Sequence, residues 1–437
     1  MKHSPNSPIL LTPSLHVDEA RRAIANLVAE LLQEANVVQD SKSVESISLD
    51  QAINRILAAD LLSPIDVPAA DNSAMDGYAF DGACLSDPTP EISLRVVGTA
   101  LAGKPHEGSI GKGECLKIMT GALMPQGCDT VIPQELTTER DSHIRFKPDQ
   151  LKAGENRRLR GEDLQQGKAA ITAGRLLRPS DLGLAASLGI SALPVRRKLK
   201  VAILSSGDEL RSLNQTLDAG SVYDSNRYSL TGLLNRLNLE IIDCGIVRDD
   251  PASLKKAFID ASEKADVLIS SGGVSVGEAD FTKQIMQELG DVGFWKIAMR
   301  PGRPMAFGVL KATPGNPSGR KTLFFGLPGN PVAVMVTFYQ FVRSALLQLN
   351  GATQTEPPLI QAISETAIRK KPGRTEFQRA ILGRGADGKP TVKLTGSQGA
   401  GILRSMSEAN CFVILGHDQG NIAAGDWVDI ALFEGLL

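Results

Sequence analysis

The chain has 437 residues, which is too long for a single hydrophobic core and predicts about two to four domains. Its 47 Lys and Arg nearly balance its 49 Asp and Glu, so the net charge gives no reason to expect nucleic acid or an anionic membrane as a partner. The five cysteines form no CxxC pair and the five histidines show no helical pairing, which argues against a disulfide framework and a zinc site. Any bound metal is expected to be a hard cation held by oxygen.

The amino terminus lacks the apolar core of a signal peptide, and no stretch approaches the roughly 20 apolar residues of a membrane-spanning helix. Scattered cysteines that leave one unpaired fit a reducing compartment. The sequence therefore predicts a soluble, cytoplasmic protein.

The first half of the chain predicts helices followed by a β-rich module. Residues 1–14 contain three prolines and several serines and are expected to form a disordered leader. Apolar residues recur at helical spacing over 17–32, and a second helical segment is expected at about 48–59. Short apolar runs separated by glycine-bearing breaks over 94–146 predict short strands.

The second half predicts an α/β domain followed by a small β domain. Residues 199–349 alternate strand, turn and helix, which is typical of a doubly wound sheet. The last helix of this region is expected at 330–349. Residues 359–437 carry short β-type runs broken by glycines, which predict a small barrel or sandwich.

Three glycine-rich turns directly follow apolar strands, at Ser205–Glu209, Ser270–Asp280 and Gly326–Pro331. Open α/β folds bind ligands at the carboxyl ends of parallel strands, so these turns are expected to lie together. Glycine allows backbone to approach a phosphate closely. A single such turn is ordinary loop construction, but three in one domain favour a phosphate-bearing ligand. None matches a P-loop or GxGxxG pattern, which argues against P-loop hydrolysis and hydride transfer.

Carboxylates occur in or beside these turns, at Asp208, Glu209, Asp249, Asp250, Glu278 and Asp280. Asp250 precedes Pro251 and is predicted to be an N-cap, and Asp280 is placed to cap a helix that begins at Phe281. Asp249 has no such structural role. Acids beside a phosphate site are consistent with Mg²⁺, because without a cation they would repel the ligand.

Positive charge comes from two segments. Lys296 lies in a strand-like alternation that is also typical of a solvated residue, whereas Arg300 and Arg303 flank Pro-Gly and suit an oxyanion. Arg157, Arg158 and Arg160 form a second cluster, a pattern most often found in a wet loop.

Six segments together resemble the molybdopterin molybdenumtransferase family, which includes MoeA proteins and the gephyrin E domain. In the family's order, and within a resemblance that covers about 17–437, they are Asp71–Ala79, Arg160–Asp163, Ser206–Leu210, Ser270–Asp280, Pro301–Pro304 and Leu327–Pro331.

The resemblance implies a multidomain α/β plus β architecture and a homodimer. The implied domains are an extended helical linker domain over 15–66 and 168–197, a β-rich inserted domain over 67–167, a central doubly wound α/β domain over 198–350 and a carboxyl-terminal β-barrel over 355–437. The implied reaction is Mg²⁺-dependent hydrolysis of adenylylated molybdopterin, with molybdate as the metal donor and AMP as a product. The molybdopterin adenylyltransferase is an implied partner.

The resemblance also implies roles for individual residues. The implied catalytic residues are Asp76, Asp163, Asp249, Asp280 and Lys296, and the implied metal ligands are Glu209, Asp249 and Asp280. The implied substrate-binding residues are Ser206, Gly207, Gly272, Gly273, Ser275, Arg300, Arg303, Pro328, Gly329, Asn330 and Pro331. Two departures stand out: Arg300 and Arg303 replace lysines found in many members, and Ala400 stands where a serine is common.

Three alternatives remain open. The molybdopterin adenylyltransferase has a fold that resembles 199–349, but the segment Asp71–Ala79 and the additional domains argue against that activity. A dimeric scaffold or substrate carrier would keep the cleft without turnover. A nucleotide or amide hydrolase would act without any pterin.

Overall fold

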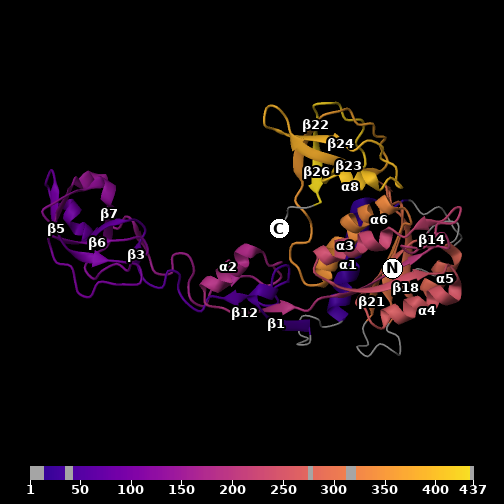
Figure 1. Cartoon of the computed structure of the whole chain (residues 1–437), viewed down its shortest axis with the longest axis horizontal. Helices are drawn as coiled ribbons and strands as arrows, with labels where there is room; N and C mark the ends of the chain where they lie inside the picture. Colours follow the sequence, from indigo (N-terminus) through magenta and orange to yellow (C-terminus); the bar gives the residue numbers. More distant parts are fainter. Residues whose placement is uncertain (1–13, 35–42, 274–278, 312–320, 434–437) are drawn as a thin grey trace. The chain divides into compact units, whose positions relative to one another are not determined.

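The computed structural model describes residues 14–34, 43–273, 279–311 and 321–433, and the side chains of 279–281 are not among the described ones. Contacts divide the chain into two units. The first unit comprises 1–59, 173–182 and 192–437, and the second comprises 60–172 and 183–191 (Figure 1). The expected leader falls almost entirely outside the described residues.

A six-stranded mixed sheet forms the centre of the first unit. Its strands in spatial order are β16 (Glu240–Val247), β13 (Lys200–Ser206), β17 (Val267–Ser271), β21 (Thr322–Leu327), β20 (Pro304–Leu310) and β18 (Gly290–Lys296). The first four are parallel, β20 runs antiparallel to β21, and β18 runs antiparallel to β20. In the register of the parallel strands, Ser205, Ser271 and Leu327 lie side by side, so the glycine turns leave the sheet at one edge.

Helices cover both faces of this sheet, which confirms the doubly wound architecture. One face carries α1 (Val17–Glu34), α3 (Asn226–Arg236) and a continuous helix made of α6 (Pro331–Thr337), the π-helical turn η6 (Phe338–Val342) and α7 (Arg343–Leu349). The other face carries α4 (Pro251–Ser262) and α5 (Ala279–Leu289). Alternation along β13 explains the two cores, because Val201 and Ile203 face the first and Ala202 and Leu204 the second.

The continuous helix corrects one expectation from the sequence. Pro331–Leu349 has 19 residues and a mean hydropathy of 1.4, so by length and composition it is long and apolar enough to cross a membrane. The expectation that no stretch approaches this limit is therefore wrong. The segment is 67% buried inside the protein, where Val332, Val336 and Phe341 belong to the sheet's core, and core helices of other proteins pass the same test.

The second predicted helix, at about 48–59, is also wrong. Only one 3₁₀ turn forms there, η2 (Leu49–Gln51), and Asn54 has a left-handed φ of 58°. Ile56 and Leu57 instead form β-bridges with Leu176 and Val195. The apolar residues whose spacing suggests a helix are instead in an extended backbone that pairs with residues more than 100 positions away in the sequence. Beside it, β1 (Val44–Ser48) pairs with β12 (Ala192–Arg196), and the connecting segment includes α2 (Pro179–Ser187).

The carboxyl-terminal part of the first unit is a closed five-stranded barrel. Its strands are β23 (Thr375–Arg384), β24 (Pro390–Leu394), β22 (Ile360–Ser364), β26 (Trp427–Leu432) and β25 (Cys411–Leu415), and β25 closes the barrel by pairing with β23. The short helix α8 (Arg404–Glu408) lies beside β23. A short strand from the α/β region, β19 (Met299–Arg300), pairs in parallel with β23 and joins the barrel's hydrogen bonding to that region.

The second unit is built on a six-stranded sheet. Its strands in spatial order are β7 (Thr130–Pro133), β4 (Gly77–Phe80), β6 (Glu114–Ile118), β5 (Ile92–Ala100), β9 (His143–Phe146) and β8 (Thr138–Arg140). Tyr78 and Phe80 face one core and Ala79 the other, so both faces are buried. Short ladders join β3 (Asn72–Ser73) to β10 (Arg157–Arg158) and β2 (Leu61–Leu62) to β11 (Ala169–Ile171). The unit is β-rich, as expected.

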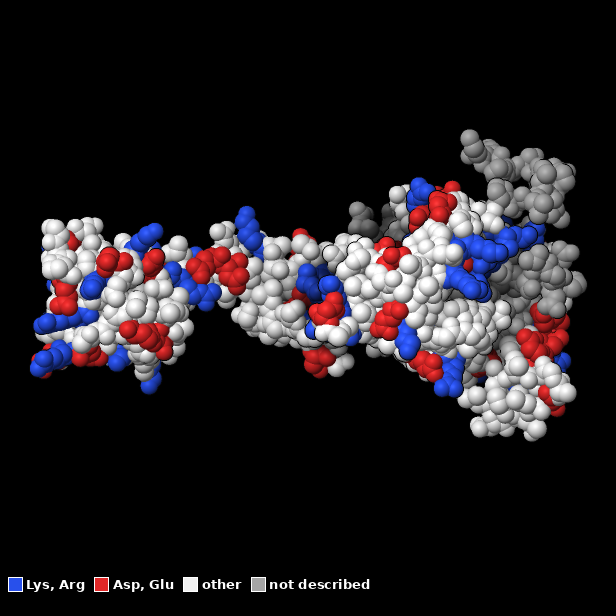
Figure 2. All heavy atoms as spheres, turned by 90° about the horizontal axis from the view of Figure 1, so that it is seen from above, with Lys and Arg blue, Asp and Glu red and all other residues white. Residues whose placement is uncertain are grey.

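Figure 2 shows both acidic and basic side chains on the face that it draws, mixed in some places and gathered into small patches of one sign in others. The formal net charge is −2. Recognition of a charged ligand must therefore depend on local groups.

Candidate active site

The three glycine turns meet at the carboxyl edge of the sheet. Gly272, in the second turn, has a left-handed φ of 89°, and a Cβ there would collide with the carbonyl oxygen of Ser206 in the first turn. A Cβ on Gly329, in the third turn, would lie 4.0 Å from the Cα of Gly272. Glycine at 272 is thus required both by the backbone conformation and by the close approach of two turns.

A cavity of about 470 Å³ opens at this junction. Its wall contains Ser206, Gly207, Asp208, Glu209, Leu210, Asn226, Asp249, Ser271, Gly272, Gly273, Arg300, Pro301, Gly302, Arg303, Pro304, Pro328, Gly329, Asn330, Ala333, Gln398 and Ala400. Most of the binding residues expected from the sequence are therefore brought together.

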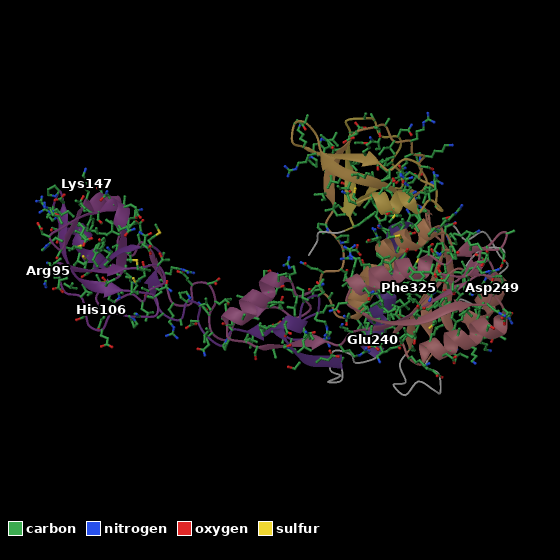
Figure 3. The ribbon with its side chains drawn as sticks, in the orientation of Figure 1. Arg95, His106, Lys147, Glu240, Asp249 and Phe325 are labelled. Carbon is green, nitrogen blue, oxygen red and sulfur yellow. The ribbon has the colours of Figure 1, made fainter. Side chains whose placement is uncertain are left out.

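Carboxylates form one side of the cavity. Asp249 lies just beyond the carboxyl end of β16, and Glu240 begins the same strand at its other end (Figure 3). The Oγ of Ser206 donates a hydrogen bond to Oδ1 of Asp249 at 3.2 Å, and the Asp249 amide approaches Oδ1 of Asp208 at 3.5 Å. Asp250 caps α4 by accepting from the Ser253 amide at 2.9 Å, as predicted, which leaves Asp249 free for the cavity.

Cationic groups come from the segment that contains β19. Arg300 and Arg303 both line the cavity with exposed side chains. Arg300 lies in register with Glu376 of β23, and the Arg303 carbonyl accepts from the Ile297 amide at 2.8 Å. Their backbone is therefore held at fixed points. Both guanidinium groups are exposed, and that of Arg303 has one long contact, from Nη2 to Ser14 Oγ at 3.5 Å.

The barrel places a further cation close to this segment. Arg379 is 1% exposed, and it donates from Nε to Ser405 Oγ at 3.0 Å and from Nη2 to the Gly399 carbonyl at 3.0 Å. Burial, together with the charge of Arg300, lowers the pKa of Arg379 to about 10. These bonds also hold the loop that carries Gln398 and Ala400 to the cavity.

Sequence reasoning assigns no role to Asn226 in the cavity wall or to Arg379 beside it. The only local signal for Asn226 is a polar side chain in the first turn of a helix that follows the first glycine turn. Local patterns do not indicate that the barrel loop with Gln398 and Ala400 reaches the cavity, and only the family resemblance at position 400 suggests a contact from the barrel.

Other expected residues are not in the described cavity wall. Lys296 is exposed at the end of β18. Pro331 is the first residue of α6 and follows the wall residue Asn330 in the sequence. Ser275 and Glu278 lie outside the described residues. Asp280 is in the first turn of α5, but its side chain lies outside the described part of the structure.

Asp76 and Asp163 belong to the second unit. Oδ1 of Asp76 accepts from both the amide and the Oγ1 of Thr120 at 2.7 Å. These bonds, the backbone one first, hold the pKa of Asp76 below its usual 3.8. Asp163 is exposed, and its amide donates to the Val67 carbonyl at 3.0 Å.

The arginine cluster of the second unit is paired with acids. Arg158 Nε contacts Glu162 at 2.8 Å, Arg160 Nε contacts Asp66 at 2.6 Å, and Arg157 Nε lies 3.6 Å from Asp71. These pairs fit the structural interpretation of the cluster.

The donor chemistry of the cavity fits a hard divalent cation. Asp208, Glu209 and Asp249 supply carboxylate oxygens, the ligands that Mg²⁺ prefers. Among the described residues, no group of three or more His, Cys, Asp or Glu is already arranged around a metal position. The carboxylates therefore suit Mg²⁺ without forming a closed protein cage, which agrees with the usual way this ion is bound beside phosphates.

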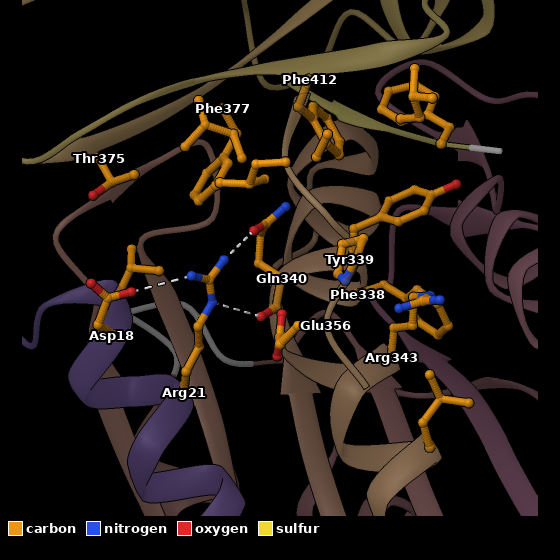
Figure 4. A pocket seen from close by; sticks show the side chains of 18 of the residues that line it. Asp18, Arg21, Phe338, Tyr339, Gln340, Arg343, Glu356, Thr375, Phe377 and Phe412 are labelled. Carbon is orange, nitrogen blue, oxygen red and sulfur yellow. Dashed lines mark hydrogen bonds and ion pairs between the residues drawn. The ribbon is translucent and has the colours of Figure 1, made fainter. Parts of the chain in front are cut away.

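A larger cavity, of about 710 Å³, lies elsewhere in the first unit (Figure 4). Its wall includes aromatic side chains from η6 and the barrel, among them Phe338, Tyr339 and Phe412. Arg21 is held there by Gln340 Oε1 at 2.6 Å and Asp18 Oδ1 at 3.2 Å. Its described wall contains none of the glycine turns and neither of the acids Glu209 and Asp249, so the smaller cavity is the candidate active site.

Three family models match the chain in succession. The MoeA N-terminal region (domain I and II) matches 15–189, a probable molybdopterin binding domain matches 202–348, and the MoeA C-terminal region (domain IV) matches 361–433. Among solved structures, a molybdopterin biosynthesis moeA protein from Pyrococcus horikoshii OT3 superposes with a TM-score of 0.77 at 26% identity, over 96% of this chain and 100% of that one.

Curated relatives match over nearly the whole length. A molybdopterin molybdenumtransferase from Haemophilus influenzae is 43% identical over 395 residues, which are 90% of this chain and 95% of the relative. One from Nostoc is 34% identical over 430 residues, covering 97% of this chain and 96% of the relative. The chain belongs to the molybdopterin molybdenumtransferase family of enzymes.

Proposed function

We propose that this enzyme inserts molybdenum from molybdate into adenylylated molybdopterin in molybdenum cofactor biosynthesis, with Mg²⁺ and with release of AMP. The observation that supports this most directly is the single cavity in which acids from the α/β sheet lie with Arg300 and Arg303 beside three glycine turns. A phosphoanhydride and an oxyanion both need fixed positive charge, and a divalent cation needs the acids.

In this proposal the turns bind the phosphates and the arginines bind the oxyanion. Backbone around Gly207, Gly272 and Gly329 can approach phosphate oxygens closely. Arg300 and Arg303 present planar donor groups that suit molybdate or pyrophosphate oxygens. Pro328 and Asn330 shape the third turn. Ala400 contributes no hydroxyl to this wall, so a serine contact expected of many members is not available here.

Glu209 and Asp249, with Asp280, are proposed to hold the Mg²⁺. When bound there, the ion would polarise the phosphoanhydride. Ser206 donates to one carboxylate oxygen of Asp249, which fixes the rotamer of that side chain and leaves its second oxygen for a ligand.

The remaining parts of the proposal depend on the resemblance. Asp76, Asp163 and Lys296 are retained as catalytic residues, and the chain is proposed to act as a cytoplasmic homodimer that receives substrate from the molybdopterin adenylyltransferase. We also propose the domain boundaries that the resemblance implies: a linker domain over 15–66 and 168–197, an inserted domain over 67–167, an α/β domain over 198–350 and a barrel over 355–437.

The test is AMP release from adenylylated molybdopterin, measured with and without Mg²⁺ and molybdate, with sulfate as a tetrahedral dianion that carries no molybdenum. The expected result is release that requires both Mg²⁺ and molybdate and is not supported by sulfate. Binding of the pterin without release would favour a substrate carrier. Release from nucleotides that carry no pterin would favour a general hydrolase, and AMP transfer from ATP to free molybdopterin would favour the adenylyltransferase.

A further inference from the structure

Asn226, the first residue of α3, and Asp224, two residues before it, are hydrogen-bonded to the ends of β13 and β17 and to the third glycine turn. Asp224, which is 2% exposed, accepts from Ser205 Oγ at the end of β13 at 3.0 Å. Asn226, which is 8% exposed, donates from Nδ2 to Ser271 Oγ at the end of β17 and to the Gly329 carbonyl in the third turn, both at 2.7 Å. One side chain therefore connects the second glycine turn to the third.

The orientation of the Asn226 amide is fixed by its partners. A backbone carbonyl can only accept, so the nitrogen of the amide must face Gly329. The oxygen of the amide, Oδ1, is buried and has no hydrogen-bond partner. A buried acceptor without a hydrogen-bond partner destabilises the folded state. The favourable contribution of Asn226 must therefore come from the two hydrogen bonds that its nitrogen donates.

Among the described residues of the two turns, the other backbone links lie at their base, where the ladder between β17 and β21 ends at Ser271 and Leu327. Gly272 donates its amide to the Leu327 carbonyl at 3.2 Å, but Gly329 and Asn330 are exposed at the cavity. The carbonyl of Gly329 thus faces a buried donor, while the rest of this turn faces the ligand space. A shift of the third turn would change the distance between the two stretches of backbone that are proposed to receive phosphate.

We propose that Asn226 is a positioning residue for this enzyme, which sets the separation of the second and third glycine turns and so the geometry in which phosphate is bound. The inference rests on the proposed function only for the identity of the ligand. The link between the turns is a property of the protein alone and can be measured without substrate.

Substitution of Asn226 by aspartate makes the hydrogen bond to the Gly329 carbonyl depend on pH. Asn226→Asp preserves shape, but an ionised carboxylate cannot donate to the Gly329 carbonyl, whereas a protonated carboxyl can. Burial raises the pKa of such a carboxyl, so the bond should return as the pH falls. Asn226→Leu removes the donor at every pH. Asn235→Asp, at an exposed position of the same helix, is the matched control.

The first measurement is hydrogen exchange of the amides of 271–273, 326, 327, 329 and 330 in the full chain, corrected for intrinsic rates. We expect both variants at 226 to lose about tenfold of protection in both turns at neutral pH, the equivalent of one hydrogen bond. Protection should return at pH 5 in Asn226→Asp but not in Asn226→Leu. Asp224, Asp249 and Glu209 also carry carboxyl groups near this site, and the native chain measured at both pH values corrects for any effect of theirs.

The second measurement is steady-state AMP release at the same two pH values. We expect Asn226→Asp to raise KM by about tenfold at neutral pH with a smaller change in kcat, and to approach native KM at pH 5. A residue with a merely structural role would lower the melting temperature without this pH-dependent recovery of KM.

The outcomes separate the two proposals. Unchanged protection of both turns in Asn226→Leu, or the same loss in Asn235→Asp, would overturn the positioning role whatever the activity. A second outcome is that Asn226→Asp loses protection of the turns at neutral pH and recovers it at pH 5, but the native chain releases no AMP. That outcome would support the positioning role and count against the proposed function.

Discussion

Ser206 and Asp249 are joined by a hydrogen bond of 3.2 Å from the serine Oγ to the carboxylate Oδ1. The bond links the first glycine turn to a residue just beyond the end of β16, and the two residues are separated by 43 positions in the sequence. It gives one acid of the cavity a defined orientation, while the next residue, Asp250, is occupied with capping a helix.

Adjacent acids in this segment should therefore respond differently to substitution. Asp249→Asn is expected to lower the kcat of AMP release roughly 100-fold with little change in stability, because it removes charge where the cation is proposed to bind. Asp250→Ala should lower the melting temperature by about 2–4 °C and leave kcat near native. Kinetics and thermal melts of both variants test this. Equal loss of kcat in the two would show that the segment acts only through folding.

Adjacent glycines in the second turn should differ in the same way. Gly272→Ala places a Cβ against the Ser206 carbonyl, whereas among the described residues the nearest atom to a Cβ at Gly273 would be Thr282 Oγ1 at 3.5 Å. Both have left-handed φ, so both substitutions strain the backbone by about 1–2 kcal/mol. Only Gly272→Ala should also separate the first two turns, with a larger rise in KM. Similar KM values for the two variants would mean that this contact is unimportant for binding.

The basic residues near the cavity should differ in how much they contribute to the binding of an oxyanion. Arg300→Ala should weaken binding of molybdate or pyrophosphate by about tenfold at low salt, with a smaller effect at high salt because the side chain is exposed. Lys296→Ala should change binding less than about twofold, since Lys296 is not in the described cavity wall, and its proposed catalytic role should appear in kcat instead. Calorimetric titration of both variants distinguishes them. A larger effect at Lys296 would place the oxyanion outside this cavity.

The carboxyl of Asp76 gives a test by pH. Its folded pKa lies below 3.8, so its contribution to stability is present above the unfolded pKa and is lost as the pH falls through the folded pKa. Thr120→Val removes one of the two donors and should raise the pKa, but the value should stay below 3.8 because the backbone donor remains. Carbon NMR titration of chains labelled at aspartate measures it. A pKa unchanged in the variant would mean that the hydroxyl bond is not made.

The glycine turns could be predicted because their signal is local. A strand followed by glycines has few interpretations, and the parallel register of β13, β17 and β21 then places the three turns at one edge. Asp249 and the N-cap Asp250 were distinguishable for the same reason, since the proline after Asp250 marks a helix start.

The barrel's share of the site could not be predicted from local patterns. Arg379 and Gln398 reach the cavity region only because β23 pairs with β19 and because the barrel closes on itself, and both are long-range events. The wrong helix at 48–59 has a similar origin, since Ile56 and Leu57 pair with distant residues. In each case tertiary pairing decides what the local sequence leaves open.

The pairing of β19 with β23 means that the cavity is not the property of one domain. The α/β sheet carries the acids and the glycine turns, but the strand that carries Arg300 takes its hydrogen-bond partner from the barrel. An α/β domain excised at about residue 354, or transplanted into another protein, would keep a phosphate-binding edge and lose the fixed arginine beside it. Modular reuse of this domain therefore requires a new way to anchor its positive charge.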